Sequence, residues 1–374
     1  MNLAISILIP LCVISSVYLY AYPVFNAKCA FPKAGVVRLL ALADPQIEGN
    51  SAISAQRDAV SRLRKQVDLW GNDLYLAHIY RTLKRFTSPT LTVVLGDLLG
   101  SQWIDDTEFS RRSDRFWNVV FDGFSNVLTL PGNHDIGYAG DISPARIARF
   151  EAAFGPVNAM ETWNETLRVV LLNSMNLDSP ALNLDLQQQT WDFLNDALAP
   201  KEQESILLLT HIPLHKEDGV CPDAPFFEYF GDEEGRFASY KGGVREQNHL
   251  SKETSRAILD KLAAFESAFV VNGHDHRGCD TLHLPNGVAE RFNGTIPEGG
   301  IREVTVRSMM GEFGGNAGFL SAGIEDGRWV FEYSACQLGV QHIWWAVHVL
   351  DLLTLGICIG FGAKKTLRPK AKKE

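Results

Sequence analysis

Five apolar segments of this chain each end at a short polar element, and this arrangement limits the folds open to it. The segments cover residues 36–42, 90–95, 127–130, 206–209 and 269–271. Their length and apolar character predict β-strands, and helix-period stretches separate them. In α/β domains, the loops at strand ends carry the chemistry. The pattern therefore predicts an α/β domain whose functional residues meet at one place.

The polar elements that follow these strands offer groups that bind metal ions. They are Asp44-Pro45-Gln46, Gly96-Asp97, Gly132-Asn133-His134-Asp135, His211 and Gly273-His274-Asp275-His276. Carboxylate, amide and imidazole ligands without thiolate suit manganese, iron or zinc. The glycines allow a strand to turn sharply and let backbone approach the metals. Each element alone is typical of a turn or a helix cap, but five in order predict a metal centre.

The rest of residues 35–335 fits the same single domain, with a β-rich final third and no internal repeat or linker. Helical spacing predicts helices over residues 55–86, 105–124, 187–198 and 251–265, and Gly71 is a possible interruption of the first. Further strands are expected at residues 169–172, 303–306 and 329–333.

Two long apolar stretches lie near the ends of the chain. Residues 3–25 carry no charge and are long enough to span a bilayer. We favour a retained anchor there over a cleaved signal peptide, which has a shorter apolar region and a basic start. Residues 343–362 form the second stretch, with Trp344 and Trp345 suited to the headgroup interface. Inside it, His348 and Asp351 are expected to pack against the first span rather than to line a polar route.

The basic tail at residues 363–374 predicts the orientation of both spans. Basic flanks stay on the cytoplasmic side, which places both termini in the cytosol and the domain between them in the lumen. The sequons at Asn164 and Asn293 agree with a luminal domain. The net charge of −9 and a pI near 5.6 argue against a nucleic-acid partner, which attracts a basic field.

Cysteine usage also fits an oxidising compartment. Cys12 and Cys358 lie in the spans, and an even number remain outside them: Cys29, Cys221, Cys279 and Cys336. Three pairings of these four are possible. We favour Cys29 with Cys336 and Cys221 with Cys279, and four free thiols are the alternative.

The order of the polar elements resembles the calcineurin-like metallophosphoesterase superfamily, over residues 36 to about 276. The resemblance implies a four-layer sandwich of two β-sheets flanked by helices, and two divalent metal ions, manganese first, with iron or zinc as alternatives. It implies two ligand groups, Asp44, Asp97 and His276 for one metal, and Asp97, Asn133, His211 and His274 for the other. It further implies that His134 stabilises the transition state or protonates the leaving oxygen, and that Asp135 orients it.

Gln46 departs from this family pattern, because most members have histidine at that position. An amide oxygen is a poorer ligand than imidazole, so we expect Gln46 to be a weak metal ligand or to act just behind the ligands. Asp44-Pro45-Gln46 resembles a narrower group, the endoplasmic-reticulum phosphodiesterases that remodel glycosylphosphatidylinositol (GPI) anchors. Residues 245–251 and 307–316 resemble its fungal branch.

The narrower resemblance implies removal of ethanolamine phosphate from a mannose of the GPI anchor, the second mannose being favoured. It implies cargo receptors and coat proteins of endoplasmic reticulum–Golgi transport as partners, and cycling to the Golgi. Lys370 and Lys372 match the cytosolic dilysine signal that returns membrane proteins to the endoplasmic reticulum. The alternatives are a luminal metallophosphatase acting on another lipid or sugar phosphate, and a non-catalytic cargo-sorting adaptor.

One loop segment is a candidate for recognising the ethanolamine ammonium. Residues 217–234 combine acids with aromatic rings, and both attract cations. A solvated loop with a few buried rings is the alternative. The members that we single out are Asp223, Phe226, Phe227, Tyr229, Asp232 and Glu233.

Overall fold

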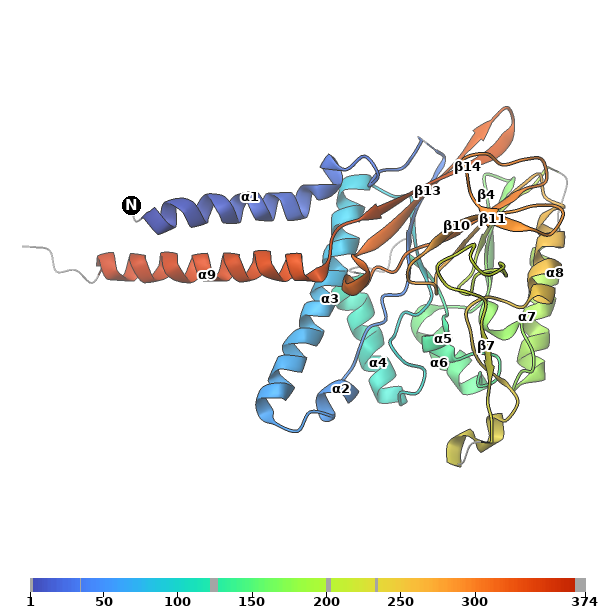
Figure 1. Ribbon diagram of the computed structural model, residues 1–374, viewed down its shortest axis with the longest axis horizontal. Coiled ribbons are helices and arrows are strands. Elements are labelled where there is room, and N and C mark those ends of the chain that lie inside the picture. Colours follow the sequence, from blue (N-terminus) through green and yellow to red (C-terminus); the bar gives the residue numbers. More distant parts are fainter. Residues whose placement is uncertain (1–2, 34, 122–126, 200–202, 233–234, 367–374) are drawn as a thin grey trace, which may run out of the picture.

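Figure 1 shows an α/β body from which two long helices, α1 (Leu3–Phe25) and α9 (Gln341–Thr366), leave on the same side. In this computed structural model, the described chain comprises residues 3–366 without 34, 122–126, 200–202 and 233–234. The predicted retrieval residues, Lys370 and Lys372, lie outside the described residues.

Two large sheets form the centre of the described part of the domain, which confirms the predicted sandwich. Their strand orders are β14-β13-β1-β2-β3 and β11-β10-β12-β9-β6-β5-β4. The first sheet comprises β1 Val37–Leu42, β2 Leu91–Leu95, β3 Val127–Leu130, β13 Asn316–Glu325 and β14 Arg328–Gln337. The second comprises β4 Ala159–Trp163, β5 Leu167–Leu171, β6 Ser205–Leu209, β9 Ser267–Asn272, β10 Cys279–His283, β11 Ala289–Arg291 and β12 Ile301–Thr305. A separate small sheet pairs β7 (Phe227–Tyr229) with β8 (Val244–Gln247).

The strands that precede the polar elements run parallel to their neighbours. β1, β2 and β3 pair in parallel in the first sheet, as do β5, β6 and β9 in the second. Alternate side chains of β1 point to different layers. Leu39 and Ala41 join the apolar cluster between the two sheets, whereas Leu40 and Leu42 pack under the helices. Both faces of the parallel strands are therefore buried, and their carboxyl ends are the positions left for polar groups.

The helices cover the outer faces of the two sheets. α3 and α4 lie on the side of the terminal helices, and α7 and α8 lie on the opposite side (Figure 1). The helix bounds are α2 Ser51–Ser54, α3 Ala59–Thr87, α4 Asp106–Arg115, α5 Asn133–Ile136, α6 Pro144–Phe154, α7 Leu184–Ala197 and α8 Lys252–Leu262.

Two of the predicted helices are corrected. The helix predicted from residue 55 begins at Ala59, because the side chain of Asp58 caps it by accepting from the Ser61 N–H at 2.8 Å. Gly71 does not interrupt it; the Trp345 ring packs so closely there that an added Cβ would lie 1.8 Å from a ring carbon. The helix predicted over 105–124 ends at Arg115 and continues as a π-helical turn, Phe116–Val120.

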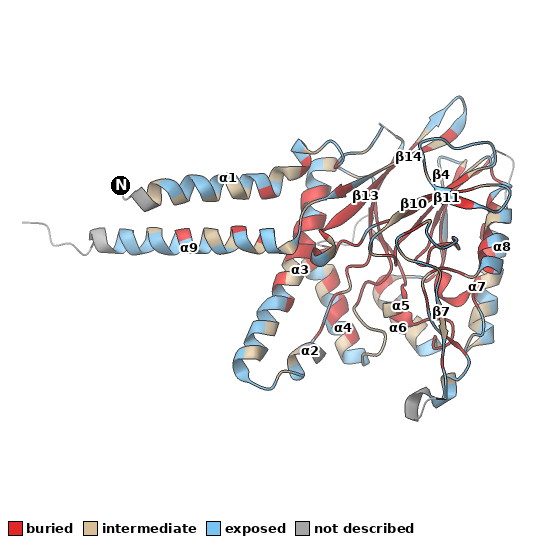
Figure 2. Ribbon diagram, in the orientation of Figure 1, coloured by how far each residue is buried: buried red, intermediate tan, exposed pale blue. Residues whose placement is uncertain are grey.

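α1 and α9 pack side by side, and both are long and apolar enough to cross a membrane. Polar side chains link them at successive turns. Ser16 Oγ donates to Asp351 Oδ2 at 2.9 Å, and Tyr20 Oη lies 2.9 Å from His348 Nε2. These contacts confirm that both polar residues of the second span pack against the first. In Figure 2 the outer faces of both helices are exposed, as expected for surfaces that meet lipid.

The favoured cysteine pairing is also confirmed within the described residues. Cys29 bonds Cys336, which joins the segment after α1 to the end of β14. Cys221 bonds Cys279, the first residue of β10. Disulfides of this kind form in oxidising compartments.

Candidate metal centre

The backbone at the strand ends brings the predicted ligands together. Asp44 (φ 53°), Asp97 (φ 50°) and His274 (φ 72°) all occupy the left-handed region, which is rare outside glycine and typical of functional sites. Two of the predicted glycines also permit a close approach of ligand side chains. A Cβ on Gly96 would lie 2.4 Å from His211 Nδ1, and one on Gly132 would lie 2.2 Å from Asp97 Oδ1.

One ligand group consists of Asp97, His211 and His274, with Asn133 beside them. His211 Nε2 lies 3.4 Å from Asp97 Oδ1, 3.1 Å from Asn133 Oδ1 and 3.2 Å from His274 Nδ1. All four atoms therefore point into one small space.

The ring tautomers at this group follow from backbone carbonyls, which only accept hydrogen bonds. His211 Nδ1 donates to the Leu95 carbonyl at 2.7 Å, and His274 Nε2 donates to the Gln247 carbonyl at 2.8 Å. The other nitrogen of each neutral ring then carries a lone pair. Two such lone pairs face each other across 3.2 Å. A bound cation would relieve this repulsion, and the outer carbonyls would give both rings the usual support of a metal-binding histidine.

The second ligand group consists of Asp44, Asp97 and His276. Gln46 reaches the same place: its Nε2 donates to Asp97 Oδ2 at 3.1 Å and lies 3.3 Å from His276 Nε2. If the nitrogen and oxygen of the Gln46 side-chain amide are exchanged, Oε1 rather than Nε2 faces Asp97 and His276. Because Asp97 belongs to both groups, the residues present fit two cations with one bridging carboxylate.

The electrostatics of the described site fit the same assignment. Burial lowers the pKa of His211 and His276, and burial together with His211 lowers the pKa of His274 to about 3. The rings are therefore neutral near pH 7 and free to coordinate. Burial and the neighbouring Asp97 raise the pKa of Asp44 well above its usual value. Two adjacent buried carboxylates need cations to remain ionised together.

His134 lies at the edge of both ligand groups. Its backbone N–H donates to Asp97 Oδ1 at 2.8 Å, and its Nε2 lies 3.8 Å from Asp97 Oδ2. The side chain is 36% exposed, so the ring faces both the site and the solvent. Its position is that of a group that contacts a substrate rather than one enclosed among ligands.

Asp135 holds the loop rather than the ring of His134. Its carboxylate accepts from the backbone N–H groups of Leu98, Leu99 and Gly132, at 3.1, 2.9 and 2.9 Å. The buried His134 Nδ1 has no hydrogen-bond partner among the described residues. The predicted orientation of the imidazole by Asp135 is thus corrected: Asp135 fixes the backbone that carries Asp97 and Asn133.

Both segments that resemble the fungal branch border the site. The segment 245–251 supplies the Gln247 carbonyl that accepts from His274. The segment 307–316 supplies Ser308, whose Oγ donates to the Asp44 carbonyl at 3.1 Å. The residue types alone do not indicate a role for the Gln247 carbonyl or for Ser308. In the sequence, only the family resemblance of their segments pointed to them.

A cavity of about 360 Å³ opens beside His134, and we call it the Tyr138 cavity. Its lining includes Asn133, His134, Tyr138, Trp103, Arg245 and Glu246. The sequence interpretation missed Tyr138, whose ring lies 6.2 Å from that of His274. Burial raises the pKa of Tyr138, so its hydroxyl stays protonated. The cavity therefore offers an aromatic wall with acidic and basic groups next to the proposed leaving-group residue.

The loop predicted to attract ammonium lies mostly elsewhere. Phe226, Phe227 and Tyr229 line a separate cavity with Trp191 and His215, away from the metal ligands. Asp232 pairs with Lys241, and Glu233 is outside the described residues. Of the residues named for that role, Asp223 lies near the centre, because burial and the neighbouring Asp223 carboxylate together raise the pKa of Asp275 to about 7.

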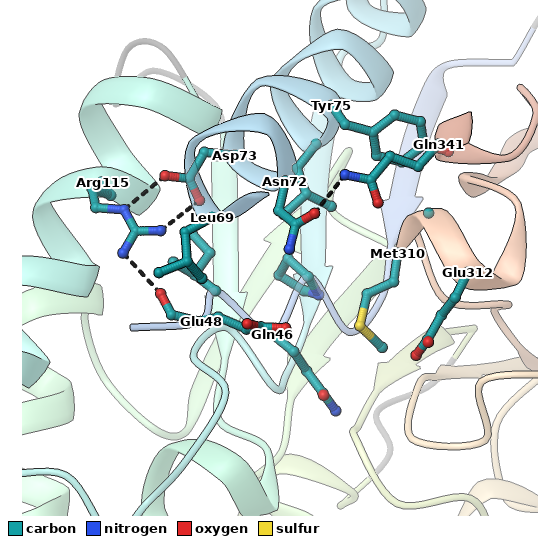
Figure 3. A pocket seen from close by; sticks show the side chains of 14 residues that line it. Gln46, Glu48, Leu69, Asn72, Asp73, Tyr75, Arg115, Met310, Glu312 and Gln341 are labelled. Atoms are coloured by element: carbon teal, nitrogen blue, oxygen red, sulfur yellow. Dashed lines mark hydrogen bonds and ion pairs between the residues drawn. The ribbon is translucent and has the colours of Figure 1, made fainter. Parts of the chain in front are cut away.

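A second, smaller cavity adjoins the centre on the side of Gln46. Its volume is about 130 Å³, and we call it the Gln46 cavity. Figure 3 shows Gln46 at its floor, with Asn72 and Asp73 of α3 and Gln341 of α9 around it. Arg115 forms ion pairs with Asp73 at 2.7 Å, and Asn72 is hydrogen-bonded to Gln341.

A fully buried ion pair supports the ligand loops from behind. Lys216 Nζ lies 2.8 Å from Glu303 Oε2, and both side chains are 0% exposed. Glu303 Oε1 accepts from Leu214 N at 2.8 Å and from Asn272 Nδ2 at 2.6 Å. These two partners lie three residues after His211 and two residues before His274. Glu303 therefore connects the two loops that carry the histidine ligands.

Comparison with known proteins gives the same result as the geometry. The family model described as calcineurin-like phosphoesterase matches residues 37–278. Protein TED1 of Saccharomyces cerevisiae is 31% identical, covering 85% of this chain and 81% of the relative. An uncharacterized protein of Schizosaccharomyces pombe is 34% identical, covering 86% and 78%. A metallophosphoesterase 1 homolog of Caenorhabditis elegans is 30% identical, covering 55% and 53%. The candidate metal ligands converge at one edge of a two-sheet sandwich, and the family match covers the same strands, so the chain belongs to the calcineurin-like phosphoesterases and is a metal-dependent phosphoesterase.

Proposed function

We propose that this protein is a two-metal phosphodiesterase of the endoplasmic-reticulum membrane that removes ethanolamine phosphate from a mannose of GPI anchors. The observation that carries the proposal is the sharing of Asp97 by two ligand groups beside an accessible His134. The terminal helices support a membrane-bound substrate, because they hold the domain next to the bilayer. The mannose that we favour is the second.

The proposed ligands are Asp44, Asp97 and His276 for one ion, and Asp97, Asn133, His211 and His274 for the other. Two divalent ions, manganese by first choice, supply charge stabilisation of the phosphoryl group and a nucleophile near neutral pH. Gln46 completes the first group or supports it through Asp97. The backbone carbonyls behind His211 and His274, and the buried Glu303 behind their loops, hold these donors in place without large rearrangement.

His134 is the proposed acid for the leaving group. The hydrolysis adds water to phosphorus and breaks the bond from phosphorus to the mannose oxygen. That oxygen leaves with a proton, which gives a free sugar hydroxyl and ethanolamine phosphate. His134 combines solvent access with proximity to Asp97 and belongs to neither ligand group, so we assign its Nε2 to deliver the proton.

The Tyr138 cavity supports recognition of the ethanolamine ammonium. It carries the carboxylate of Glu246 and the ring of Tyr138, and both kinds of group attract a cation. The Trp103 ring in the same wall already has the Arg146 guanidinium over it, 4.3 Å from its centroid. The cavity also opens directly beside His134. We therefore place the ammonium-bearing arm of the ester in this cavity rather than against residues 226–229.

A luminal orientation belongs to the same proposal, with cargo receptors and coat proteins as partners in transport to the Golgi. Both sequon asparagines, Asn164 and Asn293, are exposed and accessible to a glycosyltransferase. Endoglycosidase treatment should shift the mobility of the wild-type protein but not that of the Asn164→Gln/Asn293→Gln variant. Replacing Lys370 and Lys372 by serine should release the protein to later compartments, and unchanged localisation contradicts a retrieval role.

Mass spectrometry of GPI glycans tests the substrate. Cells without this protein should accumulate anchors with one extra ethanolamine phosphate, and export of GPI proteins should slow. Wild-type protein should reverse both effects, and Asp97→Ala should reverse neither. Anchors of normal mass in the deletion strain contradict the GPI substrate and favour a metallophosphatase acting on another lipid or sugar phosphate. Full rescue by Asp97→Ala contradicts catalysis and favours a cargo adaptor.

A further inference from the structure

α3 exposes a row of large apolar side chains. Val60, Leu63, Val67 and Trp70 are 78%, 62%, 46% and 60% exposed. Their spacing of three, four and three residues puts them on one face of the helix. Single exposed apolar residues are common, but a continuous stripe indicates a surface that contacts a membrane or another protein. We call these four residues the α3 stripe.

The stripe faces the side from which the terminal helices leave. Leu74, His78 and Arg81 continue the same face of α3 at helical spacing. They line a cavity of about 780 Å³ together with residues of α1 and α9, and Trp70 belongs to that lining as well. α3 runs across the base of the two helices, and its first half is largely exposed (Figures 1 and 2).

Aromatic residues place the membrane boundary at the level of α3. The Tyr20 ring of α1 contacts the His78 ring of α3, with centroids 4.8 Å apart. The Trp345 ring of α9 packs on Gly71 of the same helix. Tyrosine and tryptophan at the ends of spans gather at the headgroup layer. In a bilayer crossed by both spans, α3 would lie at the headgroup layer of one leaflet, and Trp70 of its apolar stripe lines the same cavity as residues of the spans.

We propose that α3 is an interfacial helix and that the α3 stripe inserts into the leaflet that the spans cross next to the catalytic domain. The occupant of this surface is the lipid bilayer. An interfacial helix needs an apolar face against the acyl chains and cationic side chains at the phosphates. Arg81 and Arg85 follow the stripe on the same side of α3 and line the cavity between the helices. The inference depends on the two spans and not on the proposed substrate.

This placement sets the distance between the metal centre and the membrane. The opposite face of α3 carries Leu69, Asn72 and Leu76, which line the Gln46 cavity (Figure 3). A helix with its side chains is roughly 10–12 Å across. The Gln46 cavity then lies about one helix diameter above the leaflet, which suits a phosphoester close to a lipid headgroup.

Lipid quenching of a fluorescent label tests the proposal without any catalytic assay. The protein is reconstituted at full length in vesicles, with Cys12→Ser and Cys358→Ser removing the free thiols. A bimane label is attached at Leu63→Cys and, in a second variant, at Val67→Cys. Gln189→Cys on α7 is the matched control, because it is exposed on the side away from the spans. Brominated lipids should quench the two α3 labels and leave the control unchanged. Equal quenching at all three positions overturns the proposal.

A functional arm uses the variant Val60→Ser/Leu63→Ser/Val67→Ser. Its hydrolysis of a soluble phosphodiester, bis(p-nitrophenyl) phosphate, should equal that of the wild type. Its hydrolysis of a phosphodiester headgroup on a vesicle-embedded lipid should fall by about fivefold or more, because interfacial attachment is weakened. Equal loss on both substrates overturns a membrane role for the stripe. Failure of the wild type on both esters contradicts the proposed phosphodiesterase activity, and the quenching result still decides the position of α3.

Discussion

Glu303→Gln should destabilise the protein more than any single loss of a surface charge. The substitution keeps the size and shape of the side chain and keeps an oxygen for Leu214 N and Asn272 Nδ2. It removes the negative charge that faces Lys216 in a fully buried position. Besides Glu303, Lys216 Nζ bonds the neutral Leu214 carbonyl, at 2.9 Å. An uncompensated buried cation is among the most costly defects a domain can carry.

The magnitude follows from the two ways in which Lys216 can respond. Breaking a buried ion pair by removing one partner costs about 3–5 kcal/mol. Alternatively, Lys216 loses its proton and becomes neutral. At pH 7 this response limits the destabilisation to about 5 kcal/mol, because the ordinary lysine pKa of 10.5 lies roughly 3.5 pH units higher. At roughly 2–4 °C per kcal/mol, the unfolding midpoint should fall by about 6–20 °C.

The assay is thermal unfolding of the full-length protein in detergent, followed by tryptophan fluorescence. The matched controls are Lys216→Met and the double variant Glu303→Gln/Lys216→Met. The double variant should recover most of the loss, because neither charge is then left alone, and the difference gives the coupling energy of the pair. In Lys216→Met, Glu303 keeps its contact with His283 Nε2 at 2.6 Å, so the comparison that decides is with Glu303→Gln. A shift of Glu303→Gln below about 1 kcal/mol, or a double variant no more stable than Glu303→Gln, refutes the reasoning.

Four further predictions concern the metal centre and acid stability. Asp97→Ala should lose both metal ions by elemental analysis, because its carboxylate belongs to both ligand groups; one retained ion contradicts the bridge. His134→Ala should keep its metals while hydrolysis slows by about 10²–10⁴-fold, and metal loss would make His134 a ligand. Gln46→His should raise resistance to chelators at the Asp44 group, since imidazole is the better ligand; unchanged resistance places residue 46 behind the ligands. Burial lowers the pKa of His78 from 6.5 to about 4, so stability is complete above pH 6.5 and falls as the pH falls toward 4. At pH 5 the loss is about 2 kcal/mol, and His78→Phe should show a smaller drop in denaturation midpoint between pH 7 and 5.

The candidate site was largely accessible from the sequence because its ligands are tied to strand ends. Asp44, Asp97 and His211 each directly follow a buried apolar run, and local pattern alone gives their positions. The contacts that orient them were not accessible. Gln247 supports His274 through a backbone carbonyl, and any residue type can provide a carbonyl. Tyr138 reaches the site by the path of the chain after α5, which no local pattern encodes.

The fold was less completely predicted where neighbours rather than intrinsic preference create a strand. β13 contains two glycines and small residues, which argue against a strand. It is nevertheless central, pairing with β1 on one side and β14 on the other. Gly318 leaves room for the Tyr333 ring, since an added Cβ would lie 2.6 Å from it. The small residues of β13 thus weaken the strand pattern in the sequence, but the packing of the neighbouring side chains requires them.

The bond between Cys29 and Cys336 changes the mechanics of the molecule. It spans 307 residues and links the exit of α1 to the approach of α9. A tensile load applied to either terminal helix, by lateral pressure or by membrane thickness, passes across this bond to the other helix. The contacts of α3 with Tyr20 of α1 and Trp345 of α9 form a second, non-covalent connection between the helices and the domain. A protease cut in a loop between the two cysteines would therefore leave both pieces joined covalently, each still carrying one of the terminal helices.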